Sequence, residues 1–264
     1  MTRVHTFFTF TILIFCLPKI ALNSNLADSI DNPFREQSSL RDKYRNPLET
    51  LSFFGIEKNL KTLEITPGRG WYTEILANYY KDTENYYVAV YREPSLVQQI
   101  IEKIQKEFFL NFKNKQNQFG NFKTIFIEKN FQIENKLNYF DIILTFRNTH
   151  NFLDRGKAQK IYSSFHKLLK KGGILGIVQH RANESADFDF KKGYVKESFL
   201  IDFVENIGFK LSEKSEINSN PLDDKNYPKG VWTLPPRMAE GETNKDRYLK
   251  IGESDRMTLK FIKK

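Results

Sequence analysis

The stretch that decides the fold reads LEITPGRGWYTE, residues 63–74. Its apolar start predicts a buried strand, its two glycines predict a tight turn, and a helix is expected to begin near Trp71. Pro67 and Gly68 would form the turn, and Gly68 and Gly70 would let backbone approach a ligand because neither carries a Cβ. The helix start presents unpaired N–H groups to an anionic group, and Glu64 could hold a cationic amine. This predicts a ligand-binding loop, although such a turn can also be purely structural.

Outward from this loop, apolar strand-like runs alternate with amphipathic helices. We predict strands at 61–65, 86–91, 122–127, 140–145 and 174–179, with helices at 71–80, 95–112 and 154–169. Such alternation is typical of an α/β fold with a parallel sheet covered on both faces. A helix at 196–207 leads to strands at 209–217 and 256–263, and we expect these last two strands to be antiparallel because no helical crossover separates them.

Single residues predict where several helices begin and end. Asp154 is expected to cap the helix at 154–169, and Gly172-Gly173 to close it. Before the sheet, Asn46 and Pro47 indicate a helix start, and Gly55 its end.

Polar residues follow the fourth and fifth predicted strands, where ligands of open α/β sheets lie. His150 is our candidate general base, with Asn148 and Asn151 orienting a substrate and Arg147 contacting it. The alternative is a histidine that is hydrogen-bonded within a loop. His180 is a second candidate, and its neighbour at position 181 would either hold an anionic group or pair with an acidic side chain.

A long loop from residue 218 to about 244 contains the segment 230–236, GVWTLPP. Loops longer than about 12–15 residues are often functional lids. Trp232 would then face the substrate. The alternative is that Trp232 and Leu234 only pin the loop to the core.

Four segments together resemble one family: RNPLETLSFFG (45–55), EITPGRGWYTEIL (64–76), TFRNTHN (145–151) and GVWTLPP (230–236). They look like a group of bacterial predicted class I methyltransferases that depend on S-adenosylmethionine and often carry signal peptides. Residues 251–259 are similar to that group's C-terminal strand. The resemblance implies a Rossmann-like class I methyltransferase fold over residues 41–264, with S-adenosylmethionine as cofactor. The cofactor-binding residues would be Glu64, Pro67, Gly68, Gly70, Tyr91 and Glu93.

Tyr91 departs from that family's pattern. Class I methyltransferases usually end the second strand with an acidic residue that accepts hydrogen bonds from both ribose hydroxyls. A tyrosine hydroxyl cannot accept two bonds as a carboxylate does, so Glu93 would have to substitute. A dinucleotide site would want a third glycine where Thr73 stands, which disfavours an NAD-type oxidoreductase.

Charge and cysteine content exclude several classes of partner. The net charge of +9 comes from lysines interleaved with acidic residues, which indicates a solvated surface rather than a nucleic-acid interface. The single cysteine, Cys16, excludes an intramolecular disulfide, and no spacing of His and Cys predicts a metal site.

The N-terminus carries an apolar run over residues 7–17, within the length of a secretory signal and too short for a membrane span. We expect a signal peptide or N-terminal anchor over 1–23, an irregular linker over 24–40, and export to the periplasm. If the N-terminal segment stays uncleaved, it would attach the chain to the membrane surface. The expected function is methylation of a small molecule or envelope component. The alternative is a non-catalytic Rossmann-like protein that binds a ligand or partner and has lost the donor.

Overall fold

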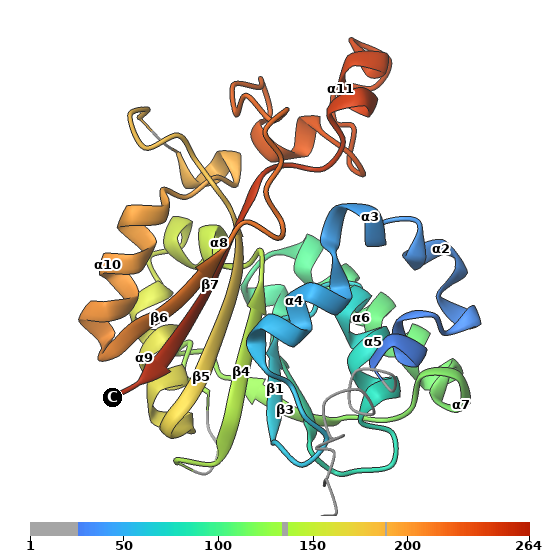
Figure 1. The fold of residues 1–264 in the computed structure, drawn as a ribbon, viewed down its shortest axis with the longest axis vertical. Helices are drawn as coiled ribbons and strands as arrows, with labels where there is room; N and C mark the ends of the chain where they lie inside the picture. Colours follow the sequence, from blue (N-terminus) through green and yellow to red (C-terminus); the bar gives the residue numbers. More distant parts are fainter. Residues whose placement is uncertain (1–25, 134–136, 188) are drawn as a thin grey trace, which may run out of the picture.

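The computed structural model describes residues 26–133, 137–187 and 189–264 of the 264-residue chain. A seven-stranded sheet of order β3-β2-β1-β4-β5-β7-β6 runs through its centre (Figure 1). The strands are β1 (Thr62–Ile65), β2 (Tyr86–Tyr91), β3 (Lys123–Ile127), β4 (Phe140–Phe146), β5 (Leu169–His180), β6 (Phe209–Ser215) and β7 (Arg256–Lys263).

Helices connect and cover these strands. The α-helices are α2 (Glu36–Ser39), α3 (Asp42–Arg45), α4 (Pro47–Phe54), α5 (Trp71–Tyr79), α6 (Gln99–Asn114), α7 (Gln116–Phe119), α8 (Thr149–Asp154), α9 (Ala158–Leu168), α10 (Glu197–Ile207) and α11 (Lys245–Ile251). The 3-10 turns are η1 (Pro33–Arg35), η2 (Pro94–Leu96), η3 (Phe190–Lys192) and η4 (Gly230–Thr233).

Strand direction confirms the predicted α/β class. Strands β1 to β5 pair in parallel, whereas β7 lies antiparallel between β5 and β6. The expected antiparallel pair at the C-terminus is therefore confirmed. Because β7 runs backwards, its first residue, Arg256, lies beside His180, the last residue of β5.

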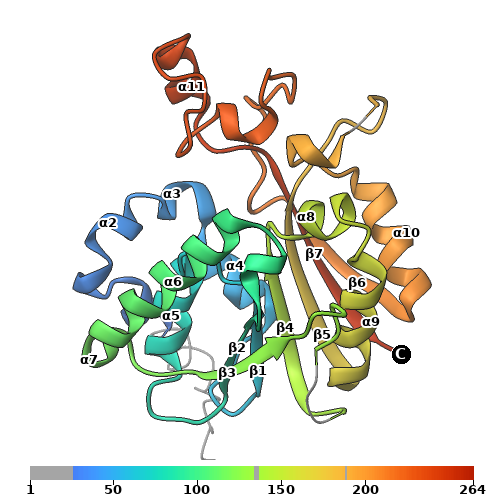
Figure 2. The ribbon, with the colours of Figure 1, turned by 180° about the vertical axis from the view of Figure 1, so that it is seen from behind.

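Both faces of the sheet are buried, as expected for parallel strands. In β4, Ile142 and Leu144 pack with α4 to α7, while Ile143 between them packs with α8 to α10 on the other face. The two ribbon views show these two helical layers with the sheet between them (Figures 1 and 2). Alternation along each strand therefore divides the core into two layers.

Two helix ends differ from the sequence expectation. Asp154 does not cap α9; it ends the short helix α8, and α9 begins at Ala158 after a turn at Gly156. Leu169 ends α9 in an extended conformation, so Gly172 and its neighbour lie inside β5 rather than at a helix end. The cause is local. Residues 149–154 form a separate helical turn, so Asp154 ends that turn instead of starting α9.

The expectation of an irregular segment before residue 41 is wrong for the described part. Residues 26–30 are helical, and Leu26 and Ile30, four residues apart, are buried in the core. The predicted helix start is confirmed, since α4 begins at Pro47 with Asn46 at its N-cap position. The side chain of Asn46 makes no capping bond, because it donates to Ile217 O at 2.6 Å instead. Gly55 closes α4 as predicted.

The proposed signal segment, residues 1–23, lies outside the described residues. Within the described ranges, none of the helices combines the length and the apolar character that a membrane crossing requires.

An arm formed by residues 218–252 projects beyond the carboxyl edge of the sheet (Figures 1 and 2). It contains η4 and α11 and has a small core of its own, in which Leu234 and Tyr248 pack with Tyr194 from outside the arm. Leu234 therefore holds the arm against the rest of the protein, which is one of the two roles that the sequence left open for this loop.

Gly176 in β5 should tolerate no side chain. A Cβ there would lie 2.7 Å from both Leu144 Cδ2 and Phe54 Cδ1. We expect Gly176→Ala to lower the free energy of unfolding by about 1–3 kcal/mol through overpacking, measured by urea denaturation. The control is Gly172→Asn in the same strand, where a Cβ meets nothing within 4 Å and the left-handed backbone suits Asn. Equal losses in both variants would contradict the close contact.

Candidate functional site

A cavity of about 180 Å³ lies at the carboxyl edge of the sheet, beside the ends of β1 and β2. Its walls come from the loop after β1, the end of β2, one side of α6, and α8 with its flanking residues. The lining residues are Thr66, Pro67, Gly68, Val90, Tyr91, Ile101, Ile104, Gln105, Phe108, Asn148, Asn151, Phe152 and Arg155. The lining is predominantly apolar, as ligand pockets usually are.

The glycine loop uses its two glycines differently. Gly68 (φ 63°) is exposed at the cavity, and a Cβ there would meet nothing within 4 Å. Gly70 (φ 88°) is buried, and a Cβ there would collide with the ring of Phe112 on α6. Gly68 thus leaves open space at the cavity, whereas Gly70 allows α6 to pack on the loop.

Glu64 lies beneath the loop and is not among the cavity residues. Its carboxyl accepts hydrogen bonds from Thr73 Oγ1 at 2.7 Å and from the hydroxyl of Tyr86. Burial raises the pKa of Glu64 to about 7, although both hydrogen bonds and the charge of Arg147 oppose this rise. Glu64 therefore ties β1 to β2 and α5, which is a different position from the amine contact that we expected.

The end of β2 presents no carboxylate to the cavity. Tyr91 lines it, while its backbone N–H donates to Gln105 Oε1 at 3.1 Å and its carbonyl accepts from Gln105 Nε2 at 2.8 Å. Glu93 forms an ion pair with Lys129 at 2.9 Å and lines a separate, smaller depression. Of the lining residues that the structure describes, none is acidic.

Asn148 connects the two loops that meet at the cavity. Its amide Nδ2 donates to Ile65 O at 2.9 Å and to Thr66 O at 3.3 Å. Asn148 and Asn151 both line the cavity, but the amide of Asn148 is used to hold the glycine loop.

The structure brings together His150, His180 and Trp232, which the sequence placed in three separate segments. The ring of His150 lies 5.8 Å from that of Trp232 and 5.7 Å from that of His180, measured between centroids. Neither histidine lines the cavity. His150 lies in the first turn of α8, and His180 is the last residue of β5. His180 Nδ1 contacts Ser254 Oγ at 2.5 Å.

The hydrogen bonds of His150 bear on its expected role as a base. Gln179 Nε2 contacts both Gly193 O at 2.9 Å and His150 Nδ1 at 3.2 Å. An amide nitrogen shared in this way donates to both, so the neutral ring carries its proton on Nε2. Burial lowers the pKa of His150 to about 4. The resting ring is therefore neutral at pH 7 and presents a hydrogen-bond donor, which suits orienting a substrate better than removing its proton.

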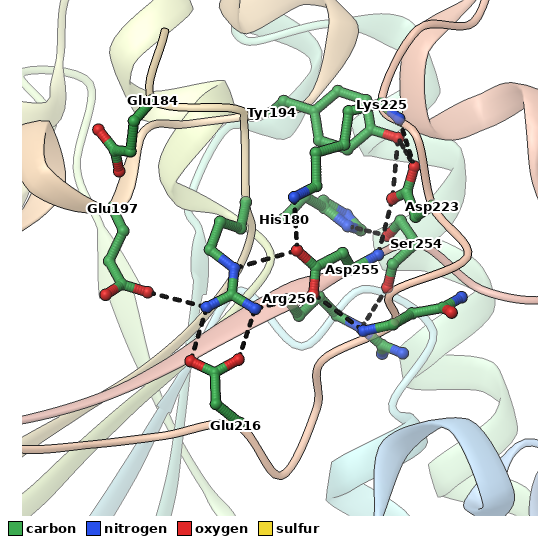
Figure 3. A network of polar contacts seen from close by, with 12 residues as sticks. His180, Glu184, Tyr194, Glu197, Glu216, Asp223, Lys225, Ser254, Asp255 and Arg256 are labelled. Atoms are coloured by element: carbon green, nitrogen blue, oxygen red, sulfur yellow. Dashed lines mark hydrogen bonds and ion pairs between the residues drawn. The ribbon is translucent and has the colours of Figure 1, made fainter.

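Arg181 forms ion pairs with acidic side chains of the protein itself. Its guanidinium pairs with Glu197 at 3.2 Å, Glu216 at 2.6 Å and Asp255 at 3.0 Å (Figure 3, where the three acidic residues are labelled). The neighbouring carboxylates raise its pKa. Of the two roles left open for this residue, the geometry matches pairing with acidic side chains.

Arg147 follows β4 with a left-handed backbone (φ 61°) and is half-buried. Burial, together with the charges of Arg41 and Arg256, lowers its pKa to about 10 against the opposing effect of Glu253. Arg41, Arg256 and Glu253 were not among the predicted site residues.

The cavity wall on α6 was also not predicted. Ile101, Ile104, Gln105 and Phe108 recur at helical spacing, and this apolar stripe was the signal that could have indicated it. Across the cavity, Arg155 Nη2 donates to Gln98 Oε1 at 3.1 Å, just before α6 begins.

A protein-family model described as a methyltransferase domain matches residues 56–226, which include the glycine loop and the whole cavity wall. The chain belongs to this family. A search among curated proteins found no relative that matches the sequence.

Solved structures share the fold of this methyltransferase domain at low sequence identity. A S-adenosylmethionine-dependent methyltransferase from Aquifex aeolicus is 17% identical, with a TM-score of 0.54 over 74% of this chain and 93% of its own. The glycopeptide N-methyltransferase MtfA, in complex with S-adenosylhomocysteine, is 11% identical (TM-score 0.53; 84% and 90%). The [4+2]-cyclase SpnF is 13% identical (TM-score 0.58; 83% and 80%), so the fold alone does not decide the reaction.

In the described ranges of the methyltransferase domain, no group of three or more His, Cys, Asp or Glu side chains is arranged to hold a metal ion.

The pKa of Glu64 makes stability depend on pH. The folded state holds this proton up to about pH 7, whereas an ordinary glutamate loses it near 4.5. The unfolded state binds fewer protons between these values, so rising pH should remove about 3 kcal/mol of stability over that window. Glu64→Gln removes this effect.

We therefore expect the unfolding free energy of Glu64→Gln, relative to the unmodified chain, to rise by about 3 kcal/mol between pH 4 and pH 8. Urea denaturation at several pH values measures it. Glu213→Gln, in an exposed ion pair with Lys260, is the control. A constant difference across this range would show that the Glu64 proton is not held by folding.

Proposed function

We propose that the protein is a methyltransferase that binds S-adenosylmethionine in the cavity under α6 and methylates a small-molecule or envelope acceptor on the side of His150. The observation that carries this proposal is the open left-handed backbone at Gly68, at the end of β1 in the family's glycine loop. A ligand can contact the loop backbone there without displacing a side chain.

The cavity residues fit the proposed cofactor in part. Val90, Ile101 and Phe108 offer apolar surface for a flat aromatic base, and Gly68 leaves room beside the loop. When bound, S-adenosylmethionine supplies a methyl group that its positively charged sulfonium already activates. The chain then has to hold the acceptor in line and exclude water.

Residues beyond the cavity support the acceptor side of this proposal. The rings of Trp232 and His150 pack edge to face, and His150 directly precedes Asn151, which lines the cavity. With its proton on Nε2, His150 donates a hydrogen bond that positions the acceptor, and Gln179 holds the ring. Trp232 limits access of water from the arm.

A second candidate is a Rossmann-like protein that binds a ligand or partner without catalysis. Two observations favour it: the described cavity residues include no carboxylate, and Glu93 is engaged by Lys129. Such a protein would keep the cavity and bind neither S-adenosylmethionine nor its product.

Calorimetric titration of S-adenosylhomocysteine into the purified protein, with NAD as control ligand, separates the two candidates. We expect saturable binding of S-adenosylhomocysteine only. Gly68→Asn should weaken it at least about tenfold by occupying the loop surface, whereas Gly172→Asn, with a similar backbone conformation far from the cavity, should not. His150→Ala should leave this affinity within about twofold and reduce turnover of any acceptor. No binding by a folded sample would reject the methyltransferase in favour of the second candidate.

We also propose that the chain is exported to the periplasm, on the basis of the apolar run at residues 7–17. Fractionation of cells that produce the full-length chain should place it in the periplasmic fraction or on the membrane. Replacing two leucines or isoleucines of that run by aspartate should retain it in the cytosol. Recovery of the unmodified chain in the cytosol alone would reject export.

A further inference from the structure

We infer that four arginines on the acceptor side, Arg41, Arg45, Arg147 and Arg256, form a binding site for an oxyanion, so that the methylated acceptor carries a carboxylate or phosphate group. That the bound molecule is a methyl acceptor rests on the proposed function. Anion binding by these residues does not, and it can be measured separately.

The topology of the sheet brings these arginines to one place. Arg147 directly follows β4, and Arg256 begins β7 opposite the end of β5. Arg45 ends α3 and comes from the other end of the sequence. Since Arg147 immediately precedes Asn148, which lines the cavity, the arginine cluster lies next to the proposed donor site.

Glu253 is the carboxylate around which the cluster is built. Its two oxygens accept from Arg41 Nε at 2.6 Å and Arg45 Nε at 3.3 Å, and Arg256 Nη1 lies 3.3 Å away. The charges of these arginines hold the pKa of Glu253 down at about 2 against the effect of burial.

One carboxylate does not balance four guanidinium groups. The positive charge of Arg147 lowers the pKa of Arg45, second only to burial, so the two groups repel each other across a poorly solvated space. His150 and His180 add no negative charge, and Asp255 is already engaged by Arg181 and Lys225. Arg45 and Arg256 are buried and the other two arginines are partly buried, and an excess of positive charge in such surroundings is costly unless an anion is bound.

Arg45 supplies the second, independent observation. The residue is 1% exposed, and its Nη1 and Nη2 have no hydrogen-bond partner within the described part of the chain. The ring of Trp71 covers one face of the guanidinium, with 4.6 Å from Cζ to the ring centroid. This contact stabilises the cation but leaves the N–H groups of Nη1 and Nη2 without a hydrogen-bond acceptor.

Arg181 shows what a structural arginine looks like in the same region: three carboxylates surround it. Arg45 has no such set of carboxylates around it. The partner that its Nη1 and Nη2 groups lack is the anion that the site binds. The planar edge of a guanidinium, with two parallel N–H groups, matches the two oxygens of a carboxylate or phosphate.

Calorimetric titration of the full chain with sodium phosphate, and separately with sodium acetate, tests the inference at pH 7 and constant ionic strength set by chloride. We expect saturable binding of at least one anion, with a Kd on the order of 1 mM or tighter. Phosphate binding alone identifies a phosphate-bearing acceptor, and acetate binding identifies a carboxylate. Either result supports the oxyanion site.

Two variants and a control locate the binding. Arg147→Gln, at a half-buried position, and Arg45→Met, which replaces a buried cation by an apolar chain of similar length, should each weaken anion binding at least about tenfold. Arg247→Gln, which removes the same charge from an exposed pair with Asp224 on the arm, should leave it unchanged. If Arg45→Met does not fold, Arg147→Gln carries the test.

Absence of saturable binding by both anions, or unchanged affinity in Arg147→Gln, would overturn the inference. Titration of the same samples with S-adenosylhomocysteine keeps the two proposals apart. Donor binding without anion binding would overturn the oxyanion site and leave the methyltransferase, whereas anion binding without donor binding would do the reverse.

Discussion

The hydrogen bonds from the Asn148 amide to Ile65 O and Thr66 O hold the site together. They connect the loop after β1 to the loop after β4, two strands that are neighbours in the sheet. The pairing of β1 with β4 brings Gly68 and Arg147 to the same edge of the sheet, and this link joins the two loops that carry them. Because the parallel strands all end at this edge, a single side-chain amide is enough to connect the cavity with the arginine cluster.

The two parts of the site differ in polarity, and the difference follows from which elements cover them. The cavity is roofed by the apolar side of α6, so its contacts are mainly with carbon. The region over β4, β5 and β7 is covered by the N-terminal helices and the arm, which bring in Arg45 and Trp232, and Glu253 lies between the arm and β7. A ligand with a flat apolar part and a separate anionic molecule would therefore be sorted to different sides of Asn148.

Apolar runs in the sequence predicted the sheet well, since β2 and β7 begin and end at the predicted residues. The glycine loop was also predictable, because few residues other than glycine adopt its backbone angles. The helix ends were harder to predict. Asp154 does not cap α9, because it is already the last residue of the short helix α8. Arg45 and Glu253 are 208 residues apart, and no local pattern indicates a contact over that distance. The position of the proton on the His150 ring was equally hidden, since it depends on how Gln179 is shared with Gly193 O.

The contacts of β7 set the order in which the molecule is completed during synthesis. This last strand lies inside the sheet, between β5 and β6, and the residues just before it bind Arg41 and Arg45 near the start of the described chain. Strands β1 to β5 can assemble before it leaves the ribosome, but the N-terminal helices cannot close on Glu253 until then. Closure over such a long stretch of chain is slow compared with local folding. The cavity is thus an early structure and the arginine cluster a late one, so the nascent chain exposes an unfilled sheet position until β7 has left the ribosome.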